Sequence, residues 1–369
     1  MAEVSKQETA VRQRNLGVDF LRSLSMLMVV TLHFLGRGGV LASLPFGSVR
    51  YGFFWLVEVA CYCAVNCFGL ISGYVGHGER LSAEKLFSAW AQVAFYAVGV
   101  SAVFKLWRYD SVSWSYLLSG FFPAVTQKYW YYTAYFALMF LMPFLNRFLR
   151  ELPRERIKPL LLTLILLFSV STAVFRQDYF GLKGGYTVIW LTVLYLIGGC
   201  IRRLGPDWGP GRLTCLAGYV LSVVLAVGCK ALILLFPSSV LSPYDGVLVS
   251  YTSPLMLLSG IFLLLLVRSF PEGRRVPARV IRFFAPLAFA AYLLQDHPLM
   301  QENLISECFA FLTAYPAALH IGAVLLAVFG TFIAGTAIEF VRQKLFKSAM
   351  ALGSKVIRKF KKSGKTDGL

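Results

Sequence analysis

Long apolar runs alternate with short polar segments along almost the whole chain. A membrane-spanning helix needs about 20 mainly apolar residues, and ten runs meet or approach that length. These ten runs lie at about 16–35, 52–76, 86–107, 129–149, 159–175, 186–202, 213–236, 250–270, 281–300 and 316–341. The pattern predicts an all-α, polytopic integral membrane protein. An even number of spans places both termini on the same side of the membrane.

The basic residues agree with this topology. If the N-terminus and every second loop share one side, that side holds most of the 36 Lys and Arg residues. The other side holds only Arg37, Arg50, Lys105, Arg108, Lys128, Arg176 and Lys183. Cytoplasmic loops are enriched in Lys and Arg, so both termini are expected in the cytoplasm. The predicted organisation is a cytoplasmic N-terminal segment 1–15, a transmembrane domain 16–341 and a basic cytoplasmic tail 342–369.

Composition excludes a soluble protein, since 57% of the 369 residues are hydrophobic and 15% are charged, with a mean hydropathy of +0.66. The net charge of +18 is explained by cytoplasmic loops that face anionic lipid headgroups. The lipid bilayer is therefore the expected partner of these charges, and nucleic acid is not needed to account for them. The seven cysteines have no zinc-like spacing with histidines, so neither a disulfide framework nor a metal site is predicted.

The first span carries two ionisable side chains, Arg22 and His33, eleven residues apart. At about 100° and about 1.5 Å per residue they share one helix face and lie roughly 16 Å apart along the axis. One reading is structural: Arg22 snorkels or pairs with Asp19 at the inner interface, and His33 is an interfacial histidine. The other reading is functional, because charge within a membrane helix is costly and needs a reason.

Arginine, ten residues and then histidine in the first span resembles the signature of the membrane-bound acyltransferase-3 family. Those proteins move acyl groups, usually acetyl, onto glycans and other exported molecules. Further family-like phrases follow in the same order, at 66–74, 128–146, 195–202 and 289–298. The chain also resembles, within this family, O-acetyltransferases related to those acting on enterobacterial common antigen and the membrane domain of the vancomycin-resistance serine racemase.

The resemblance implies an acyl-CoA donor, acetyl-CoA above all, that binds from the cytoplasm. Arg22 would hold its phosphates with help from Arg80 or Lys85, although the latter two are also ordinary cytoplasmic loop charges. Ser72 and Tyr74 would line the cytoplasmic opening, unless their segment is only a helix-packing face built on Gly69 and Gly73. His33 would act as general base or carry the acyl group itself.

Glu58 lies near the predicted depth of His33 and could hydrogen-bond the imidazole. The alternative is a structural ion pair with Arg108 or Lys230. Trp130 and Tyr135 could offer flat surfaces to a sugar ring, whereas an aromatic belt at the interface explains the neighbouring tyrosines equally well.

Asp296 and His297 reach the predicted outer mouth and could line the acceptor site, although they could also form an ordinary helix end. Gln295 stands where the family usually has histidine, which argues against a catalytic role at that position.

The sequence thus predicts a multi-pass acyltransferase of the bacterial inner membrane, without a metal. It would transfer an acyl group from cytoplasmic acyl-CoA to a hydroxyl of an envelope glycan or lipid-linked saccharide. The alternative is a transporter of a small polar solute such as an amino acid, in which Arg22, Glu58 and Lys230 line a polar path.

Overall fold

The computed structural model of the protein describes residues 15–76, 80–107, 112–238, 242–270 and 275–363. These residues form helices and turns, without a strand in the described ranges. The predicted all-α class is therefore confirmed. Nearly all of the predicted N-terminal segment, the end of the tail (364–369) and Arg108 lie outside the described residues. The main helices are α2 (Leu16–Gly36), α3 (Val49–Cys61), α4 (Ala64–Val75), α5 (Ala83–Trp107), α6 (Trp114–Ser119), α7 (Trp130–Glu151), α8 (Arg154–Ile165), α9 (Ser171–Phe175), α10 (Val188–Leu204), α11 (Arg212–Leu235), α13 (Pro254–Val267), α14 (Arg275–Phe284), α15 (Phe289–Gln295), α16 (Pro298–Met300) and α17 (Ala317–Ser363).

Each predicted apolar run coincides with a helix or with a broken pair of helices. Six helical segments in the described ranges are long and apolar enough to cross a membrane, and α14 with α15, bent by 45°, makes up to 7. By the same measure α13 is a shorter apolar helix, and α10 has only 17 residues. The chain is therefore a multi-pass membrane protein, while ten spans and cytoplasmic termini stay predictions.

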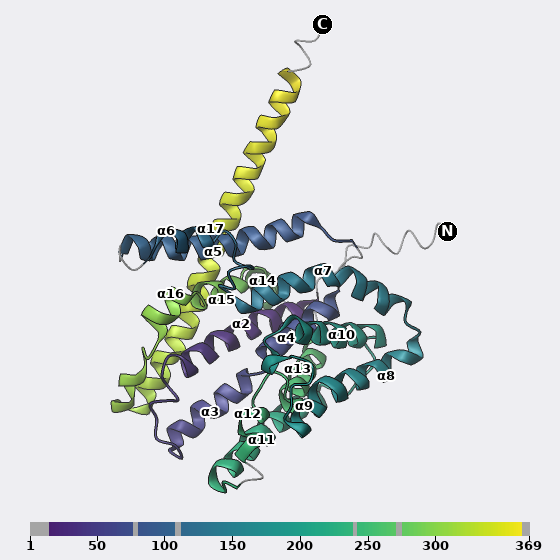
Figure 1. The fold of residues 1–369 in the computed structure, drawn as a ribbon, viewed down its shortest axis with the longest axis vertical. Helices are drawn as coiled ribbons and strands as arrows, with labels where there is room; N and C mark the ends of the chain where they lie inside the picture. Colours follow the sequence, from purple (N-terminus) through teal and green to yellow (C-terminus); the bar gives the residue numbers. More distant parts are fainter. Residues whose placement is uncertain (1–14, 77–79, 108–111, 239–241, 271–274, 364–369) are drawn as a thin grey trace.

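Helix α4 lies near the centre of the helical assembly and packs closely on α10 (Figure 1). A Cβ atom at Gly73 would collide with the carbonyl oxygen of Tyr195, and one at Gly198 would collide with that of Leu70. A Cβ at Gly69 would likewise press into the Leu194 side chain. The small residues of the 69–73 pair thus let the α10 backbone approach, which is the helix-packing role that glycine allows in membranes.

The start of α2 is fixed to the end of α13. The Asn15 side chain accepts a hydrogen bond from the Val18 amide at 3.0 Å and so caps the helix. Its amide group also donates to the Arg268 carbonyl at 2.9 Å. At Gly17 a Cβ would collide with the Val267 carbonyl, so α2 can approach α13 only with glycine at this position. These contacts set the position of the helix that carries Arg22 and His33.

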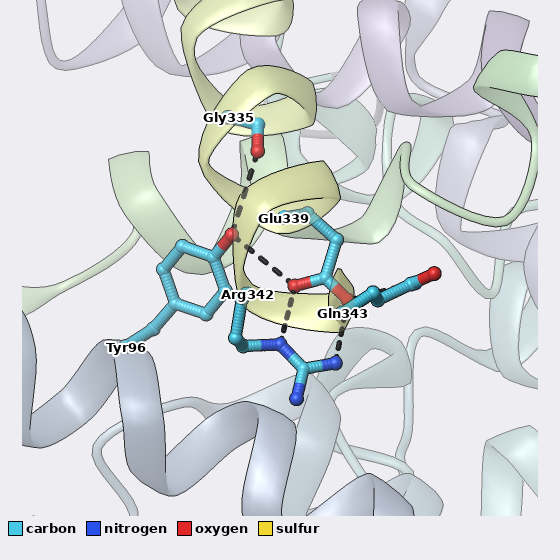
Figure 2. A network of polar contacts seen from close by, with 5 residues as sticks. All are labelled: Tyr96, Gly335, Glu339, Arg342 and Gln343. Atoms are coloured by element: carbon cyan, nitrogen blue, oxygen red, sulfur yellow. Dashed lines mark hydrogen bonds and ion pairs between the residues drawn. The ribbon is translucent and has the colours of Figure 1, made fainter. Parts of the chain in front are cut away.

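Helix α17 crosses the assembly, and its C-terminal part, yellow in Figure 1, extends past α5 and away from the other helices. The helix continues without a break through the predicted domain boundary at 341/342. Figure 2 shows how it is held to α5. The fully buried Glu339 accepts hydrogen bonds from Arg342 at 2.8 and 2.6 Å and from Gln343 at 3.0 Å, and Tyr96 of α5 lies 3.3 Å away. A buried carboxylate is tolerated here because a cation and neutral donors surround it.

Candidate active site

One face of α2 carries the residues around which the site is built. Arg22, Met26, Val29 and His33 are spaced by four, three and four residues, the spacing of a single helix face. Met26, Val29 and His33 line a small cavity, and Arg22 continues the face toward the helix N-terminus. The predicted alignment of Arg22 with His33 along one wall is thus present, with a cavity beside the histidine.

His33 is held by Gln295, at the end of α15. The Nδ1 atom of His33 lies 3.1 Å from the Gln295 side-chain oxygen, while the Gln295 amide nitrogen donates to the Val30 carbonyl at 3.3 Å. With its nitrogen committed to Val30, Gln295 presents its oxygen to the ring as an acceptor. Nδ1 then carries the proton, and Nε2 is left unprotonated, as a general base requires.

The unprotonated nitrogen faces a carboxylate. The Oδ1 atom of Asp296 lies 3.7 Å from Nε2 of His33, and both side chains are largely buried. The Gln301 side-chain amide contacts the same group of residues. It donates to the Gln295 backbone carbonyl at 3.0 Å and lies 3.5 Å from Nδ1 of His33. A carboxylate at this distance stabilises the imidazolium that forms when Nε2 takes a proton.

Aromatic rings, together with Val65, form the rest of the cavity wall around His33. They come from α4, α7, α15 and the loop before α13, and comprise Phe68, Trp130, Tyr131, Tyr251 and Tyr292. Trp130 is stacked on Tyr251 with ring centroids 6.2 Å apart and contacts Tyr186 at 4.5 Å. The cavity measures about 20 Å³, which is room for about one water molecule. A thioester can reach His33 only if these side chains move.

A second group of predicted residues meets around Tyr135 of α7. Arg22 donates to the buried Asp19 at 2.9 Å, and its guanidinium and the Ser72 side chain both interact with the Tyr135 hydroxyl. Tyr135 also lines a second cavity, of about 50 Å³, together with Arg80 and Lys85.

Four residues predicted for the donor, Arg22, Ser72, Arg80 and Lys85, therefore gather around Tyr135. Tyr135 was itself predicted to contact the acceptor, and the structure places it with the donor residues instead. The two cavities are separate. Tyr131, from the wall of the His33 cavity, is stacked on Tyr135 at 6.0 Å and lies between them.

Glu58 lies elsewhere. Its carboxylate interacts with Lys230 of α11, whose ammonium lies 5.6 Å from the centre of the Trp55 ring. The described contacts of His33 are with Gln295, Asp296 and Gln301. Among the described residues Glu58 thus lies near Lys230, which the alternative had named, and Asp296 takes the place beside His33 that Glu58 was expected to hold. The physical reason is the face on which Glu58 lies: α3 packs on α11, the helix that carries Lys230, and equal depth in the membrane does not place two side chains on facing surfaces.

Two further residues predicted for the site, His297 and Tyr74, make contacts between helices. His297 is fully buried, and its Nε2 lies 3.2 Å from Ser101 and 3.3 Å from the Ala97 carbonyl. Its Nδ1 accepts from the Leu299 amide at 3.2 Å, so this histidine caps α16 and attaches it to α5. Tyr74 is half-buried in the core, and its backbone lies against Gly198.

Sequence reasoning missed two side chains that contact His33, Gln295 and Gln301, and three that line its cavity, Tyr131, Tyr251 and Tyr292. Gln295 and Gln301 could have been found as polar side chains that interrupt or follow an apolar run. Tyr251 carries no such signal, because it comes from a loop about 220 residues after His33 in the chain.

A comparison with protein families matches residues 15–340 to the acyltransferase domain of the acyltransferase-3 family. The chain belongs to this family. No curated protein and no solved structure matches it. The match runs from α2 to about the middle of α17 and includes every residue of the two cavities. This acyltransferase-3 protein is therefore a multi-pass membrane acyltransferase, and its site has to be explained as one for acyl transfer.

Within the described residues, no group of three or more His, Cys, Asp or Glu side chains could hold a metal ion. The chemistry available at the site comes from an imidazole, a neighbouring carboxylate and two amides, inside an aromatic wall. These groups suit proton transfer to and from an oxygen nucleophile.

Proposed function

We propose that the protein transfers an acyl group, acetyl in the simplest case, from cytoplasmic acyl-CoA to a hydroxyl of an envelope glycan or lipid-linked saccharide. The proposed location is the bacterial inner membrane. The observation that carries this proposal is the single face of α2, along which Arg22, a cavity and His33 follow one another.

The cations around Tyr135 support donor binding from the side predicted to be cytoplasmic. Arg80 and Lys85 bring two positive charges to the opening beside Tyr135, and the charge of Arg22 acts on the Tyr135 hydroxyl. Phosphate groups are the natural partners of clustered Arg and Lys. The proposal places the phosphates of acyl-CoA at this opening. The pantetheine arm would run along α2 toward His33, a distance of roughly 16 Å at about 1.5 Å per residue.

The hydrogen bonds of His33 support its role as the base. Nε2 removes the proton from the acceptor hydroxyl as its oxygen attacks the thioester carbonyl. The carbon–sulfur bond then breaks, and the proton passes from Nε2 to the leaving thiolate, which departs as free CoA. Gln295 fixes the tautomer through Nδ1, and Asp296 stabilises the imidazolium through Nε2.

The stacked pair of Tyr131 and Tyr135 separates the two cavities, so donor binding has to displace it. Closed aromatic side chains keep water away from the thioester until an acceptor is present. Displacement of the pair should therefore accompany the binding of acetyl-CoA.

The test uses purified protein in detergent with acetyl-CoA labelled in the acetyl group. The wild-type protein should bind the donor and release labelled acetate slowly, or label an added envelope extract. His33→Ala should bind acetyl-CoA with unchanged affinity and lose hydrolysis and transfer by at least about 10²-fold, the usual contribution of general acid–base catalysis.

The matched control is His320→Ala, a buried histidine of α17 that lines neither cavity. It should leave turnover unchanged where the protein remains folded, as judged by gel filtration. Full activity in His33→Ala would remove the catalytic assignment. A wild-type protein that ignores acetyl-CoA and moves a polar solute across vesicles would favour the transporter alternative.

A further inference from the structure

A third and larger pocket lies outside the two cavities, on the side predicted to face away from the cytoplasm. It measures about 650 Å³, within the usual range for small-molecule sites. Helix α6, the loop that leads to α7 and the α16 segment enclose it. Its lining includes Tyr116, Ser119, Thr126, Lys128, Leu299 and Glu302. None of these residues belongs to the donor or His33 groups.

Lys128 is the unusual member of this lining. The residue is only 7% exposed, its ammonium donates to the Tyr116 carbonyl at 3.1 Å, and it lies 3.4 Å from the centre of the Tyr116 ring. In the described part of the chain no carboxylate lies within ion-pair distance of it. A buried cation without a counter-ion is costly, and an anionic ligand would offset that cost.

A second observation points the same way. The hydroxyl oxygen of Tyr116 is buried and has no hydrogen-bond partner in the structure, although buried polar groups are nearly always paired. The Ser119 and Thr126 hydroxyls donate to backbone carbonyls at 2.6 and 3.0 Å, and their oxygens remain able to accept. An aromatic ring beside hydroxyls, a cation and the exposed Glu302 suits a sugar that carries both hydroxyls and an acidic group.

The pocket is coupled to His33 through one short segment. Pro298, Leu299 and Glu302 line the pocket, whereas Gln301 of the same segment lies 3.5 Å from His33. Steps of about 100° place residue 301 roughly opposite residue 299 on a helix. The segment therefore separates the pocket from His33 by about one helix diameter, ~10 Å. A ligand that reaches both must extend over more than one sugar ring.

We propose that this pocket binds an acidic sugar, through its carboxylate or phosphate group, as the anchoring part of the acyl acceptor. Lys128 is the counter-ion, the Tyr116 hydroxyl bonds the ligand, and Glu302 accepts from sugar hydroxyls. The identification of the bound sugar as the acyl acceptor rests on the proposed function. The binding itself can be measured without any acyl donor.

The experiment titrates glucuronic acid and glucose 1-phosphate into purified protein in phosphatidylcholine nanodiscs, with glucose as the uncharged control. The wild-type protein should bind both acidic sugars at least about tenfold more tightly than glucose. Lys128→Gln should abolish this preference, Lys128→Arg should retain most of it, and Tyr116→Phe should weaken binding severalfold while keeping the ring over Lys128. Lys183→Gln, which changes an exposed lysine in another loop on the same predicted side, is the matched control and should bind as the wild type does.

Three outcomes would overturn the inference. The first is equal affinity for glucose and the acidic sugars, and the second is a preference for acidic sugars that survives in Lys128→Gln. The third is a loss of sugar binding that depends on Lys128 and occurs when phosphatidylglycerol replaces phosphatidylcholine in the nanodiscs. The last would assign the pocket to a lipid headgroup. Hydrolysis of acetyl-CoA by the same preparations separates the two proposals. Protein that hydrolyses acetyl-CoA without binding acidic sugars contradicts this inference alone, and protein that binds them without using acetyl-CoA contradicts the proposed function alone.

Discussion

The two ends of α2 differ in where their partners come from. At the inner end, Arg22 pairs with Asp19 three residues earlier on the same helix. At the outer end, His33 contacts Gln295, Asp296 and Gln301, which come from α15 and the segment after it, more than 260 residues along the chain. The inner end is thus a locally built cation, 32% exposed at its side chain, that can turn toward a ligand. The outer end is a histidine held in place by distant parts of the fold.

This difference indicates that the two ends of α2 have different roles, binding at the inner end and proton transfer at the outer end. A half-exposed arginine loses little by exchanging one carboxylate for a phosphate, so it suits binding. An imidazole with both nitrogens placed by neighbours suits proton transfer, which needs a defined tautomer and orientation. Changes at the outer end should therefore affect kcat, and changes at the inner end should affect KM for the donor.

The largest effect short of removing His33 should come from Asp296→Asn. The variant removes the charge 3.7 Å from Nε2 and keeps the shape, so kcat should fall by about 10²-fold with little change in KM for acetyl-CoA. Steady-state kinetics measure both constants, and gel filtration checks the fold. An unchanged kcat would show that the imidazolium needs no carboxylate.

At the inner end, Arg22→Gln should raise KM for acetyl-CoA by at least about tenfold, since a charge-assisted bond to phosphate contributes about 1.5–3 kcal/mol. The sharper measurement uses S-acetylpantetheine, a thioester without phosphates, whose KM should not change. Arg22→Lys keeps the charge and is the control. If the variant impairs both thioesters equally, Arg22 does not act on phosphate.

The pH dependence of acidic-sugar binding extends the comparison to Lys128. This cation is buried, whereas Arg22 is partly exposed. Burial lowers the pKa of Lys128 to about 8, and the anion binds only the protonated amine. Affinity should therefore be full at pH 7 and fall about tenfold for each pH unit above 8.

Lys128→Arg should remove this fall, because arginine stays charged. Glu302, Tyr116 and His297 also face the pocket or Lys128, and none of them differs between the two proteins. A fall that persists in the arginine variant would assign the titration to one of these three groups.

The smallest effect should come from Glu58→Gln. Its carboxylate interacts with Lys230 and does not contact His33, so kcat should change by less than about twofold. Thermal unfolding in detergent should show any loss of stability that the substitution causes. A loss of turnover close to that of Asp296→Asn would restore Glu58 to the catalytic group and contradict its placement here.

The sequence alone determined the helical class, the membrane location, the positions of the apolar helices and the shared face of Arg22 and His33. All of these follow from local periodicity, which depends on residues a few positions apart. The arginine and histidine could be paired because they lie on one helix, where about 100° per residue fixes their relation.

Only the tertiary structure decided which carboxylate faces His33, that Tyr135 lies among the residues predicted to bind the donor, and that Lys128 is buried with no carboxylate of the described residues within ion-pair distance. Each of these depends on how separate helices pack and where they break. Glu58 and Asp296 are both acidic residues near the predicted outer surface, and nothing local distinguishes them. The packing of α3 on α11 and the turn after α15 set their positions, because contacts between distant segments decide where a side chain lies once its helix has formed.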